Sequence, residues 1–316
     1  MYIVSTLWLE EKYRTMLEKE CGVTVEHVDK IADLSEEQLK QVEILLTYGY
    51  DMPAEVVQKM ESLRWIHSGQ AGIDTMPMDV LQKMGVRVTN SRGINSITIA
   101  EYVVCMLLNL ERNTYSFYEA YKQKEWDMNT RLDEMEGKSI TILGLGNVGL
   151  QIAKRVKAFD LNVVGVDLNP VKSEYIDCQY RPEQLPLAVK DCDYLVVSMP
   201  LTAETYHMID TGVLKEMKET AVVMNVGRGP IVNTDDLVDA LKNHRIRAAI
   251  LDVLEEEPVP PESSLWDVEN LMITPHIAGD RQKSYMPRMM RILCDNLNQY
   301  PDFDKMKNPV NLTLGF

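Results

Sequence analysis

A glycine-rich turn near the middle of the chain constrains the fold more than any other feature. Its sequence is Gly144-Leu145-Gly146-Asn147-Val148-Gly149, and it follows the apolar run Ser139–Leu143. A helical pattern over 151–159 and a second apolar run over 161–166 come next, and that run ends on Asp167. Strand, tight turn, helix, strand and acidic residue are the parts of a dinucleotide-binding unit. The sequence therefore predicts such a unit here.

The same segment predicts which dinucleotide binds. Glycines let the backbone turn sharply and approach the pyrophosphate, whose charge the N-terminus of the following helix favours. The carboxylate of Asp167 can accept hydrogen bonds from the adenosine ribose hydroxyls but would repel a 2′-phosphate. No arginine follows it in Leu168-Asn169-Pro170. We therefore expect NAD as the cofactor.

The 316 residues can form two domains, each with a core of its own. Before the glycine turn, short apolar runs alternate with amphipathic stretches, which predicts a separate parallel, doubly wound α/β domain. The predicted strands there cover residues 2–5, 23–28, 43–47, 65–67 and 86–89, and the predicted helices 9–19, 36–41, 54–60 and 78–83.

A second α/β series follows an apolar segment, 98–110, and an aromatic stretch that contains Tyr115, Phe117, Tyr118, Tyr121 and Trp126. Beyond the glycine turn, further strands are expected over 194–198, 221–226 and 248–251. The last stretch, 281–300, has a helical pattern apart from Pro287.

Composition excludes several classes of function. A formal net charge of −15 disfavours nucleic acids and anionic membranes as partners. No run approaches the length of a membrane span, and the first residues read as a strand and not as a signal peptide. The five cysteines are scattered without CxxC spacing, which argues against disulfides and a zinc site. We expect a cytoplasmic protein without a metal.

Three later segments carry residues suited to catalysis: Arg228 in NVGRGPIV, the stretch 252–257 in LDVLEEEP, and His276 in TPHIAG. The first two directly follow apolar strands. In an open α/β sheet, ligands bind beyond the carboxyl ends of the strands, so we expect these side chains to converge beside a bound nicotinamide.

The chemistry of these residue types fits the reduction of a 2-oxo acid. Arg228 is a permanent cation whose forked donors suit a carboxylate and an adjacent carbonyl. His276 can exchange a proton with a substrate oxygen near neutral pH. A carboxylate beside it would orient the imidazole and stabilise its charged form. From the residues alone, Glu255, Glu256 and Glu257 compete for that role.

In these motifs the whole chain resembles the D-isomer-specific 2-hydroxyacid dehydrogenases. The resemblance assigns the catalytic roles to Arg228, Glu257 and His276, the last two as a proton-transfer pair. It also identifies a substrate loop in SGQAGID, from Ser68 to Asp74, whose amides at Ala71 and Gly72 would hold the substrate carboxylate together with Arg228 and His276. Beyond Gly144, Gly146 and Gly149, the implied cofactor contacts are Asn147, Val148, Asp167, Met199, Pro200, Thr205, Val226, Asp252, Gly279 and, near the nicotinamide, Ile99.

The resemblance also implies an architecture. Boundaries near Asn95 and Asp280 would give a substrate domain of residues 1–95 with 281–316 and an NAD-binding Rossmann domain of residues 96–280, with the active site in the cleft between them. The aromatic stretch 114–126 would form the arm of a homodimer. Because the chain ends at Phe316, we expect no C-terminal regulatory extension. Glu257 stands where formate dehydrogenases carry Gln, which disfavours formate.

We therefore predict an NAD-dependent oxidoreductase that interconverts a small 2-oxo acid and the (R)-2-hydroxy acid. The alternative is a non-catalytic NAD(H)-sensing protein of the same fold that acts through protein partners, since corepressors of this family retain the catalytic triplet. The roles of His67, which borders the substrate loop, and of Trp266 stay open, as does the identity of the acid.

Overall fold

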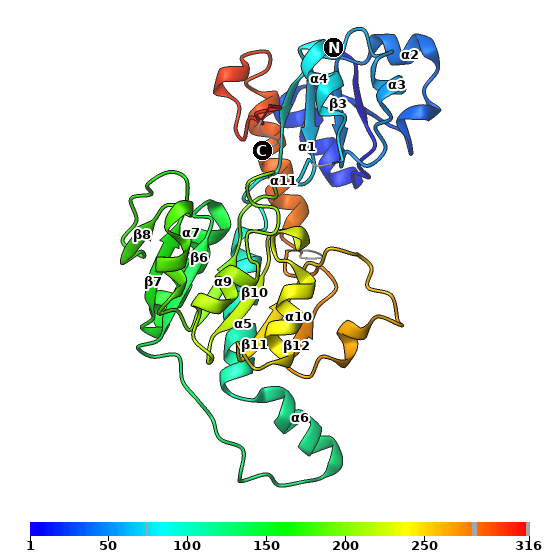
Figure 1. Cartoon of the computed structure of the whole chain (residues 1–316). Helices are drawn as coiled ribbons and strands as arrows, with labels where there is room; N and C mark the ends of the chain where they lie inside the picture. Colours follow the sequence, from blue (N-terminus) through cyan, green and yellow to red (C-terminus); the bar gives the residue numbers. More distant parts are fainter. Residues whose placement is uncertain (74, 280–282, 314–316) are drawn as a thin grey trace. The chain divides into compact units, whose positions relative to one another are not determined.

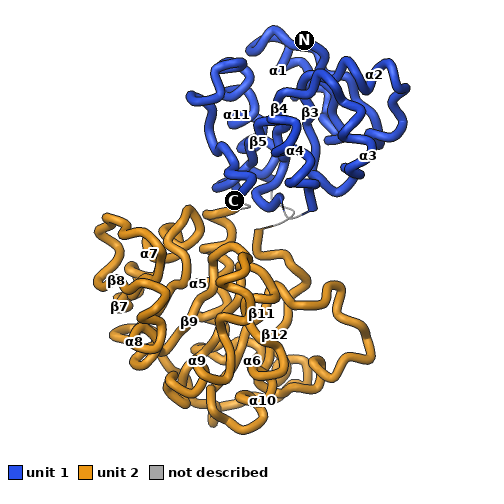
Figure 2. Tube along the Cα trace, turned by 45° about the horizontal axis from the view of Figure 1, so that its top comes forward, with its two compact units in different colours: residues 1–94, 282–316 blue, residues 95–281 orange. Residues whose placement is uncertain are grey.

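The chain forms two compact units (Figure 2). The computed structural model describes residues 1–73, 75–279 and 283–313. Unit 1 consists of residues 1–94 with 282–316, and unit 2 of residues 95–281. Asp74, Asp280 and residue 281, which the sequence analysis named, lie outside the described residues. The assignment of substrate to one unit and of NAD to the other stays a prediction.

Unit 1 is built on a five-stranded parallel sheet with the strand order β2-β1-β3-β4-β5. Its strands are β1 (Ile3–Ser5), β2 (Val25–His27), β3 (Ile44–Thr47), β4 (Trp65–Ser68) and β5 (Arg87–Thr89). Successive residues of a strand face opposite sides, so Ile44 and Leu46 enter one core and Leu45 enters the other. Both faces of this sheet are therefore buried, which explains the nearly continuous apolar strands.

Helices cover both faces of this sheet (Figure 1). One face packs on α1 (Glu11–Cys21) and α11 (Tyr285–Leu297), the other on α2 (Glu36–Gln41), α3 (Ala54–Val57) and α4 (Met78–Met84). Helix α11 thus returns the end of the chain to the unit in which it begins. The prediction of a helix over 54–60 was too long: Lys59 and Met60 bond to carbonyls three residues back, in tighter turns.

Unit 2 contains a seven-stranded parallel sheet with the order β12-β11-β10-β9-β6-β7-β8. Its strands are β6 (Ser139–Leu143), β7 (Asn162–Val166), β8 (Cys178–Tyr180), β9 (Tyr194–Val197), β10 (Val222–Asn225), β11 (Ala248–Leu251) and β12 (Leu271–Ile273). The chain runs outward from β6 to β8 and then returns to β9 on the other side of β6. This reversal makes the carboxyl end between β6 and β9 the place where a doubly wound sheet binds ligands.

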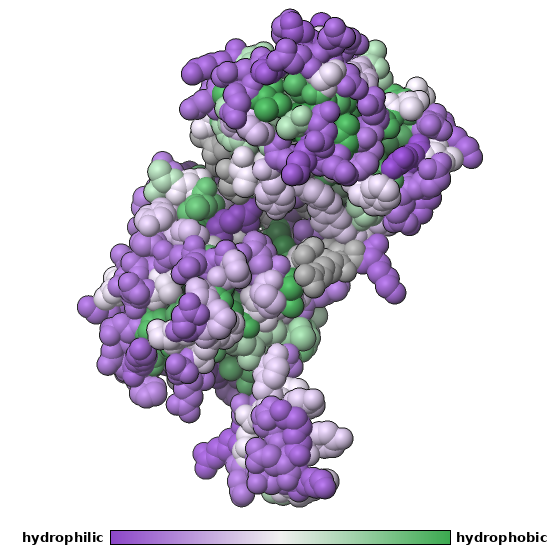
Figure 3. All heavy atoms as spheres, turned by 90° about the vertical axis from the view of Figure 1, so that its right-hand side faces the viewer, coloured by the Kyte–Doolittle hydropathy of each residue, from purple (hydrophilic) through white to green (hydrophobic). Residues whose placement is uncertain are grey.

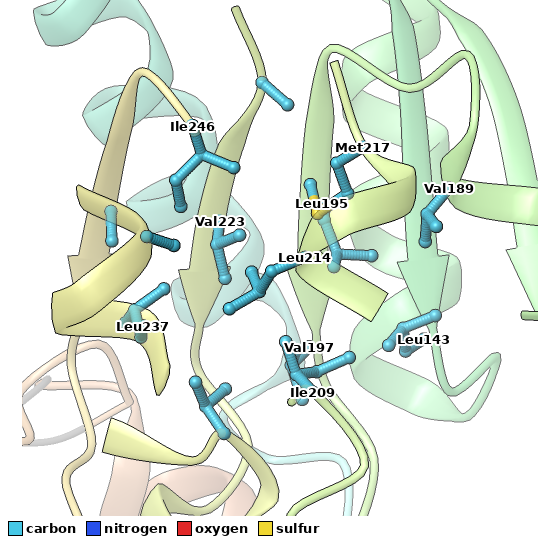
Figure 4. Packing of buried hydrophobic residues seen from close by; sticks show 14 of the residues in the cluster. Leu143, Val189, Leu195, Val197, Ile209, Leu214, Met217, Val223, Leu237 and Ile246 are labelled. Carbon is cyan, nitrogen blue, oxygen red and sulfur yellow. The ribbon is translucent and has the colours of Figure 1, made fainter. Parts of the chain in front are cut away.

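The helices of unit 2 are α5 (Ser96–Glu111), α6 (Thr114–Gln123), α7 (Asn147–Val156), α8 (Leu185–Val189), α9 (Thr211–Glu216) and α10 (Thr234–Lys242). Helices α5 and α7 pack on one face of the sheet. Helices α8, α9 and α10 pack on the other, where Leu195, Val197 and Val223 of the sheet meet Leu214 of α9 and Leu237 of α10 (Figure 4). The predicted fold class, two doubly wound parallel-sheet domains, is confirmed.

Helix α6 and the segment after it project from the rest of unit 2 (Figure 1). No residue of α6 is buried, so the aromatic stretch is not part of the core. Within the described residues, no helix is long and apolar enough to cross a membrane.

His67 is a core residue at the end of β4. Its side chain is fully buried, with Nδ1 2.9 Å from Thr89 Oγ1 and Nε2 3.4 Å from Ser91 Oγ. Burial lowers the pKa of His67 to about 3. The imidazole is therefore neutral near neutral pH. It contacts Ser91, whose amide donates to the Gln70 carbonyl in the loop after β4.

This burial predicts a pH dependence of stability. In the unfolded chain His67 takes up a proton near its ordinary pKa of 6.5, whereas in the folded chain it does so only near 3. Acidification from pH 7.5 to 5 should therefore favour unfolding by about 2 kcal/mol through this group, and the contribution should vanish above about pH 7.5. Urea titrations that follow the fluorescence of buried Trp65 should show this fall in the free energy of unfolding on acidification in the wild type but not in His67→Gln. Parallel pH curves for the two proteins would contradict the prediction.

Candidate active site

The carboxyl ends of the parallel strands place almost all candidate residues along one edge of the sheet of unit 2. The glycine turn follows β6, Asp167 follows β7, and Met199 lies in the loop after β9. Arg228 lies in the loop after β10, Asp252 directly follows β11, and His276 lies three residues beyond β12. Ala71 and Gly72 follow β4 and belong to unit 1.

The three glycines of the turn differ in what surrounds them. Gly144 has a φ of +91°, which favours glycine, and a Cβ on Gly149 would lie 2.0 Å from the Gly144 carbonyl oxygen. Gly146 has an extended backbone, and a Cβ there would meet nothing within 4 Å. Gly144 and Gly149 therefore serve the turn and the close packing of helix on strand, whereas Gly146 borders open space.

That open space lies at the N-terminus of α7, whose first residues are Asn147 and Val148. The N-cap residue is Gly146, and within the described residues it provides no side-chain cap, so the first amides of α7 can bind an anion. An open cradle with uncapped amides fits the pyrophosphate of a dinucleotide.

The carboxylate of Asp167, which the sequence analysis predicts to bind the ribose, also holds the glycine turn in place. Its Oδ2 accepts a hydrogen bond from the Leu145 amide at 2.8 Å, and its Oδ1 accepts one from the Asn169 amide at 3.0 Å. Each carboxylate oxygen has a second acceptor site. The residue can therefore hold the glycine turn and still accept ribose hydroxyls.

The loop after β9 lies between the glycine turn and the loop after β10. A Cβ on Gly144 would lie 2.9 Å from Met199 Cα, and one on Gly227 would lie 2.8 Å from the Met199 carbonyl oxygen. Thr205 closes this loop by donating from Oγ1 to the Pro200 carbonyl at 2.9 Å. The amide of Val226 donates to the Val197 carbonyl. These cofactor candidates therefore lie at the reversal point of the sheet.

Asp252 organises the loop that carries His276. Its carboxylate is buried and accepts hydrogen bonds from Thr274 Oγ1 at 2.6 Å and from the amides of Ile277 and Ala278 at 2.9 Å each. Since the Thr274 hydroxyl proton goes to Asp252, the hydroxyl of Tyr102 in α5 must donate to Thr274 Oγ1, at 2.6 Å. The sequence assigned Asp252 to the cofactor and did not foresee this anchoring role.

The same loop ends against α5. A Cβ on Gly279 would lie 3.2 Å from the Cδ1 atom of Ile99. Gly279, an implied cofactor contact, and Ile99, which the resemblance places near the nicotinamide, are therefore neighbours.

His276 and Glu257 form a hydrogen-bonded pair. The imidazole Nδ1 lies 2.8 Å from Glu257 Oε2, and the other carboxylate oxygen, Oε1, accepts the Leu254 amide at 2.8 Å. A carboxylate can only accept here, so Nδ1 carries the proton and donates it. His276 has a φ of +52°, held by the loop bonds to Asp252. The side chain is about half exposed, and Nε2 contacts no acceptor or donor among the described residues.

Neither of the other two glutamates of the acidic run bonds to His276 within the described chain. Glu255 bonds to His207 Nε2 at 3.1 Å and accepts the Thr234 amide at 2.8 Å. Burial acts to raise the pKa of Glu255, but these bonds outweigh it and hold the pKa below its ordinary value. Glu256 is exposed and makes no hydrogen bond within the described chain. Glu257 alone reaches His276.

Arg228 begins the turn after β10, with its side chain half-buried and its Nη1 donating to the Gly227 carbonyl at 2.9 Å. A Cβ on the next residue, Gly229, would lie 1.9 Å from the Leu254 carbonyl oxygen. The Arg228 turn therefore packs directly on the loop that carries Glu257.

The loop after β4 in unit 1 presents backbone amides. Its carbonyls are occupied: Gly69 accepts from the Tyr285 hydroxyl, Gln70 from the Ser91 amide, and Ala71 from Asn90 Nδ2 at 2.7 Å. Among the described residues, no acceptor bonds to the amides of Ala71 and Gly72. This arrangement suits an anionic ligand.

Trp266 makes no hydrogen bond to the candidate site residues among the described residues. It is half exposed and donates from Nε1 to the Pro260 carbonyl, so it caps its own loop. Within the described part of the chain, no group of three or more His, Cys, Asp or Glu side chains is placed to hold a metal ion.

Comparisons with known proteins identify the family and the fold. Residues 104–278 match the family described as D-isomer specific 2-hydroxyacid dehydrogenase, NAD binding domain. A glyoxylate reductase of Thermofilum pendens is 32% identical over 274 residues, covering 83% of this chain and 80% of that protein. A crystal structure from Aeromonas salmonicida subsp. salmonicida, of a D-isomer specific 2-hydroxyacid dehydrogenase family protein, has a TM-score of 0.85 and 28% identity, covering 98% of this chain and 99% of that one.

This chain belongs to the D-isomer specific 2-hydroxyacid dehydrogenase family. The predicted family, the class of NAD-dependent oxidoreductase and the nicotinamide dinucleotide cofactor are thereby confirmed. A D-3-phosphoglycerate dehydrogenase of Archaeoglobus fulgidus is 31% identical over 89% of this chain, but the chain spans only 53% of that relative. The roles of the individual site residues stay predictions.

The different surroundings of two glycines predict different mutant behaviour. Gly146→Ala should fold with less than about 1 kcal/mol of lost stability, because its Cβ enters open space. It should weaken NADH binding roughly tenfold or more, because that space is where the pyrophosphate approaches. Gly149→Ala should instead destabilise the free protein by about 1–3 kcal/mol, because its Cβ clashes with backbone.

Thermal unfolding without cofactor and fluorescence titration with NADH separate the two effects. A Gly146→Ala protein that binds NADH like the wild type would contradict the assignment of the pyrophosphate to this turn.

Proposed function

We propose that this chain interconverts a small 2-oxo acid and the corresponding (R)-2-hydroxy acid with NAD(H). The observation that carries the proposal is the His276–Glu257 pair, 2.8 Å apart, with the Arg228 turn packed on the same loop. A permanent cation and a proton-carrying imidazole supported by a carboxylate are the groups that reduction of a 2-oxo acid needs.

The mechanism assigns one task to each side chain. The bound dinucleotide supplies the hydride that adds to C2 of the substrate. The guanidinium of Arg228 binds the substrate carboxylate and polarises the C2 carbonyl. Nε2 of His276 donates a proton to the C2 oxygen. Glu257 stabilises the imidazolium before the transfer and keeps the neutral ring oriented afterwards. Hydride and proton together complete the two-electron reduction.

We also propose NADH as the preferred cofactor, by at least about tenfold over NADPH, because Asp167 would repel a 2′-phosphate. The name of the Thermofilum relative, glyoxylate reductase, makes glyoxylate the first substrate to test, followed by hydroxypyruvate and pyruvate. The five free cysteines support a reducing, cytoplasmic setting. A protein that binds NADH but turns over no 2-oxo acid would favour the alternative, a sensor that acts through protein partners.

The proton-transfer pair predicts a shifted pH profile. Glu257→Gln keeps the shape of the side chain but removes the charge that favours the imidazolium. Reduction needs the protonated ring, so the alkaline limb of kcat/KM should move to lower pH in this variant. His276→Ala should lose most activity at every pH, and Arg228→Ala should raise KM and lower kcat while NADH binding stays largely intact.

Glu256→Gln is the matched control. It removes the same charge from the preceding residue, whose side chain is exposed. It should leave the pH profile in place. An unshifted alkaline limb in Glu257→Gln, with a shifted one in Glu256→Gln or Glu255→Gln, would reject the pairing.

We further propose a homodimer formed through the arm, residues 114–126. The arm and the segment after it project from the rest of unit 2 (Figure 3). Trp126 in the arm is 90% exposed, and the other large exposed side chains of the arm are Tyr115, Tyr118 and Tyr121. Met128 and Leu132, just after the arm, are exposed as well. A set of this size in one protruding segment suits burial against a second copy of the chain.

Sedimentation velocity should show a dimer at micromolar concentration. The double variant Tyr121→Ser, Trp126→Ser should weaken association at least roughly tenfold, since each aromatic contributes apolar area to the contact. Trp8→Ser, which changes an exposed tryptophan of unit 1, should leave the dimer intact. A monomeric wild type, or a dimer that the arm variant does not weaken, would refute the arm as the interface.

A further inference from the structure

The loop after β7 has a charged neighbour that is distant in the sequence. Arg181 directly follows β8, as Asp167 directly follows β7, and these strands pair in parallel with Val166 opposite Tyr180. The Asp167 amide donates to the Tyr180 carbonyl at 3.3 Å. The backbones of two residues of opposite charge therefore lie side by side at the edge of the sheet where the adenosine end of the cofactor is expected.

The side chain of Arg181 turns toward the Asp167 loop. Its Nη1 donates to the carbonyl of Leu168 at 3.4 Å, one residue beyond Asp167. The backbone of Arg181 is fixed, since its amide donates to Gln184 Oε1 and its carbonyl accepts the Gln184 amide. The guanidinium is exposed and forms no ion pair with a carboxylate of the described chain. Most of its five donors are therefore available to a ligand.

The chemistry of this position is that of cofactor selection. An acidic residue after the second strand of the unit accepts the ribose hydroxyls of NAD, and an arginine nearby accommodates the 2′-phosphate of NADP. A forked guanidinium suits a phosphate, whereas the carboxylate repels it. This chain carries both groups on adjacent strand ends.

We propose that Arg181 is a cofactor-selectivity residue, which binds the 2′-phosphate of NADPH beside the loop after β7 and offsets part of the repulsion from Asp167. The inference rests on the proposed function only through its dinucleotide site. NADH remains the better cofactor because of Asp167, and NADPH is a usable second one because of Arg181. The preference is thus set by two opposed charges and not by Asp167 alone.

Equilibrium binding tests this without turnover. Dissociation constants for NADH and NADPH, from nicotinamide fluorescence, are compared in the wild type, Arg181→Gln, Arg181→Lys, Asp167→Asn and the double variant Asp167→Asn, Arg181→Gln. Arg181→Gln should weaken NADPH binding roughly tenfold and NADH binding less than about twofold. Arg181→Lys should restore part of the NADPH affinity, because a cation remains. Asp167→Asn should strengthen NADPH binding because the repulsion is removed, and the double variant should bind NADPH less tightly than Asp167→Asn alone.

Two further arms complete the test. Lys190→Gln, which removes an exposed cation after α8, should leave both affinities unchanged. Adenosine 2′,5′-bisphosphate should compete less well against Arg181→Gln than against the wild type, whereas 5′-AMP should compete equally. Equal losses for NADH and NADPH in Arg181→Gln, or a double variant that binds NADPH as tightly as Asp167→Asn alone, would overturn the proposal. Failure to reduce any 2-oxo acid would refute the proposed function but leave these binding results intact.

Discussion

The buried carboxylate of Asp252 is the interaction on which the candidate site depends most. It accepts three hydrogen bonds from the loop after β12, from Thr274 Oγ1 and the amides of Ile277 and Ala278. A buried carboxylate is costly unless such donors surround it, so the loop has little freedom to move away. His276 lies inside this clamped segment with a φ of +52°. The position of the proposed proton donor is therefore set by a residue that need not touch the substrate.

Parallel strand pairing brings the other loops of the candidate site in unit 2 together. Because every strand of the unit 2 sheet runs the same way, the loops after β6, β7, β9, β10, β11 and β12 all emerge at one edge. Close contacts between these loops then set their spacing: Gly229 packs on Leu254, and Gly227 and Gly144 pack on Met199. Glycine is required where backbone meets backbone, so the motifs quoted from the sequence are packing constraints as well as chemical ones.

The sequence predicted the strongly apolar elements and missed the weakly apolar ones. Strand β8, Cys178–Tyr180, has little apolar content, and α6 buries no side chain, so neither produces a periodic pattern. The residues of the proposed proton-transfer pair were named from their motifs, but three consecutive glutamates could not be told apart until their contacts were known. The His207–Glu255 bond joins residues 48 positions apart, and Arg181 reaches Leu168, 13 positions earlier, across two adjacent strand ends. No local sequence pattern predicts such contacts.

The central claim is that the clamped loop presents a proton donor to a 2-oxo acid during hydride transfer. Stereospecifically deuterated NADH, [4-²H]NADH of each face, with glyoxylate, hydroxypyruvate and pyruvate tests it most directly, with product analysis by NMR. The account predicts deuterium at C2 of the product from one face of the cofactor only, with (R) configuration where C2 is a stereocentre, and loss of the transfer in His276→Ala. Tight NADH binding without deuterium transfer to any of these acids would contradict it.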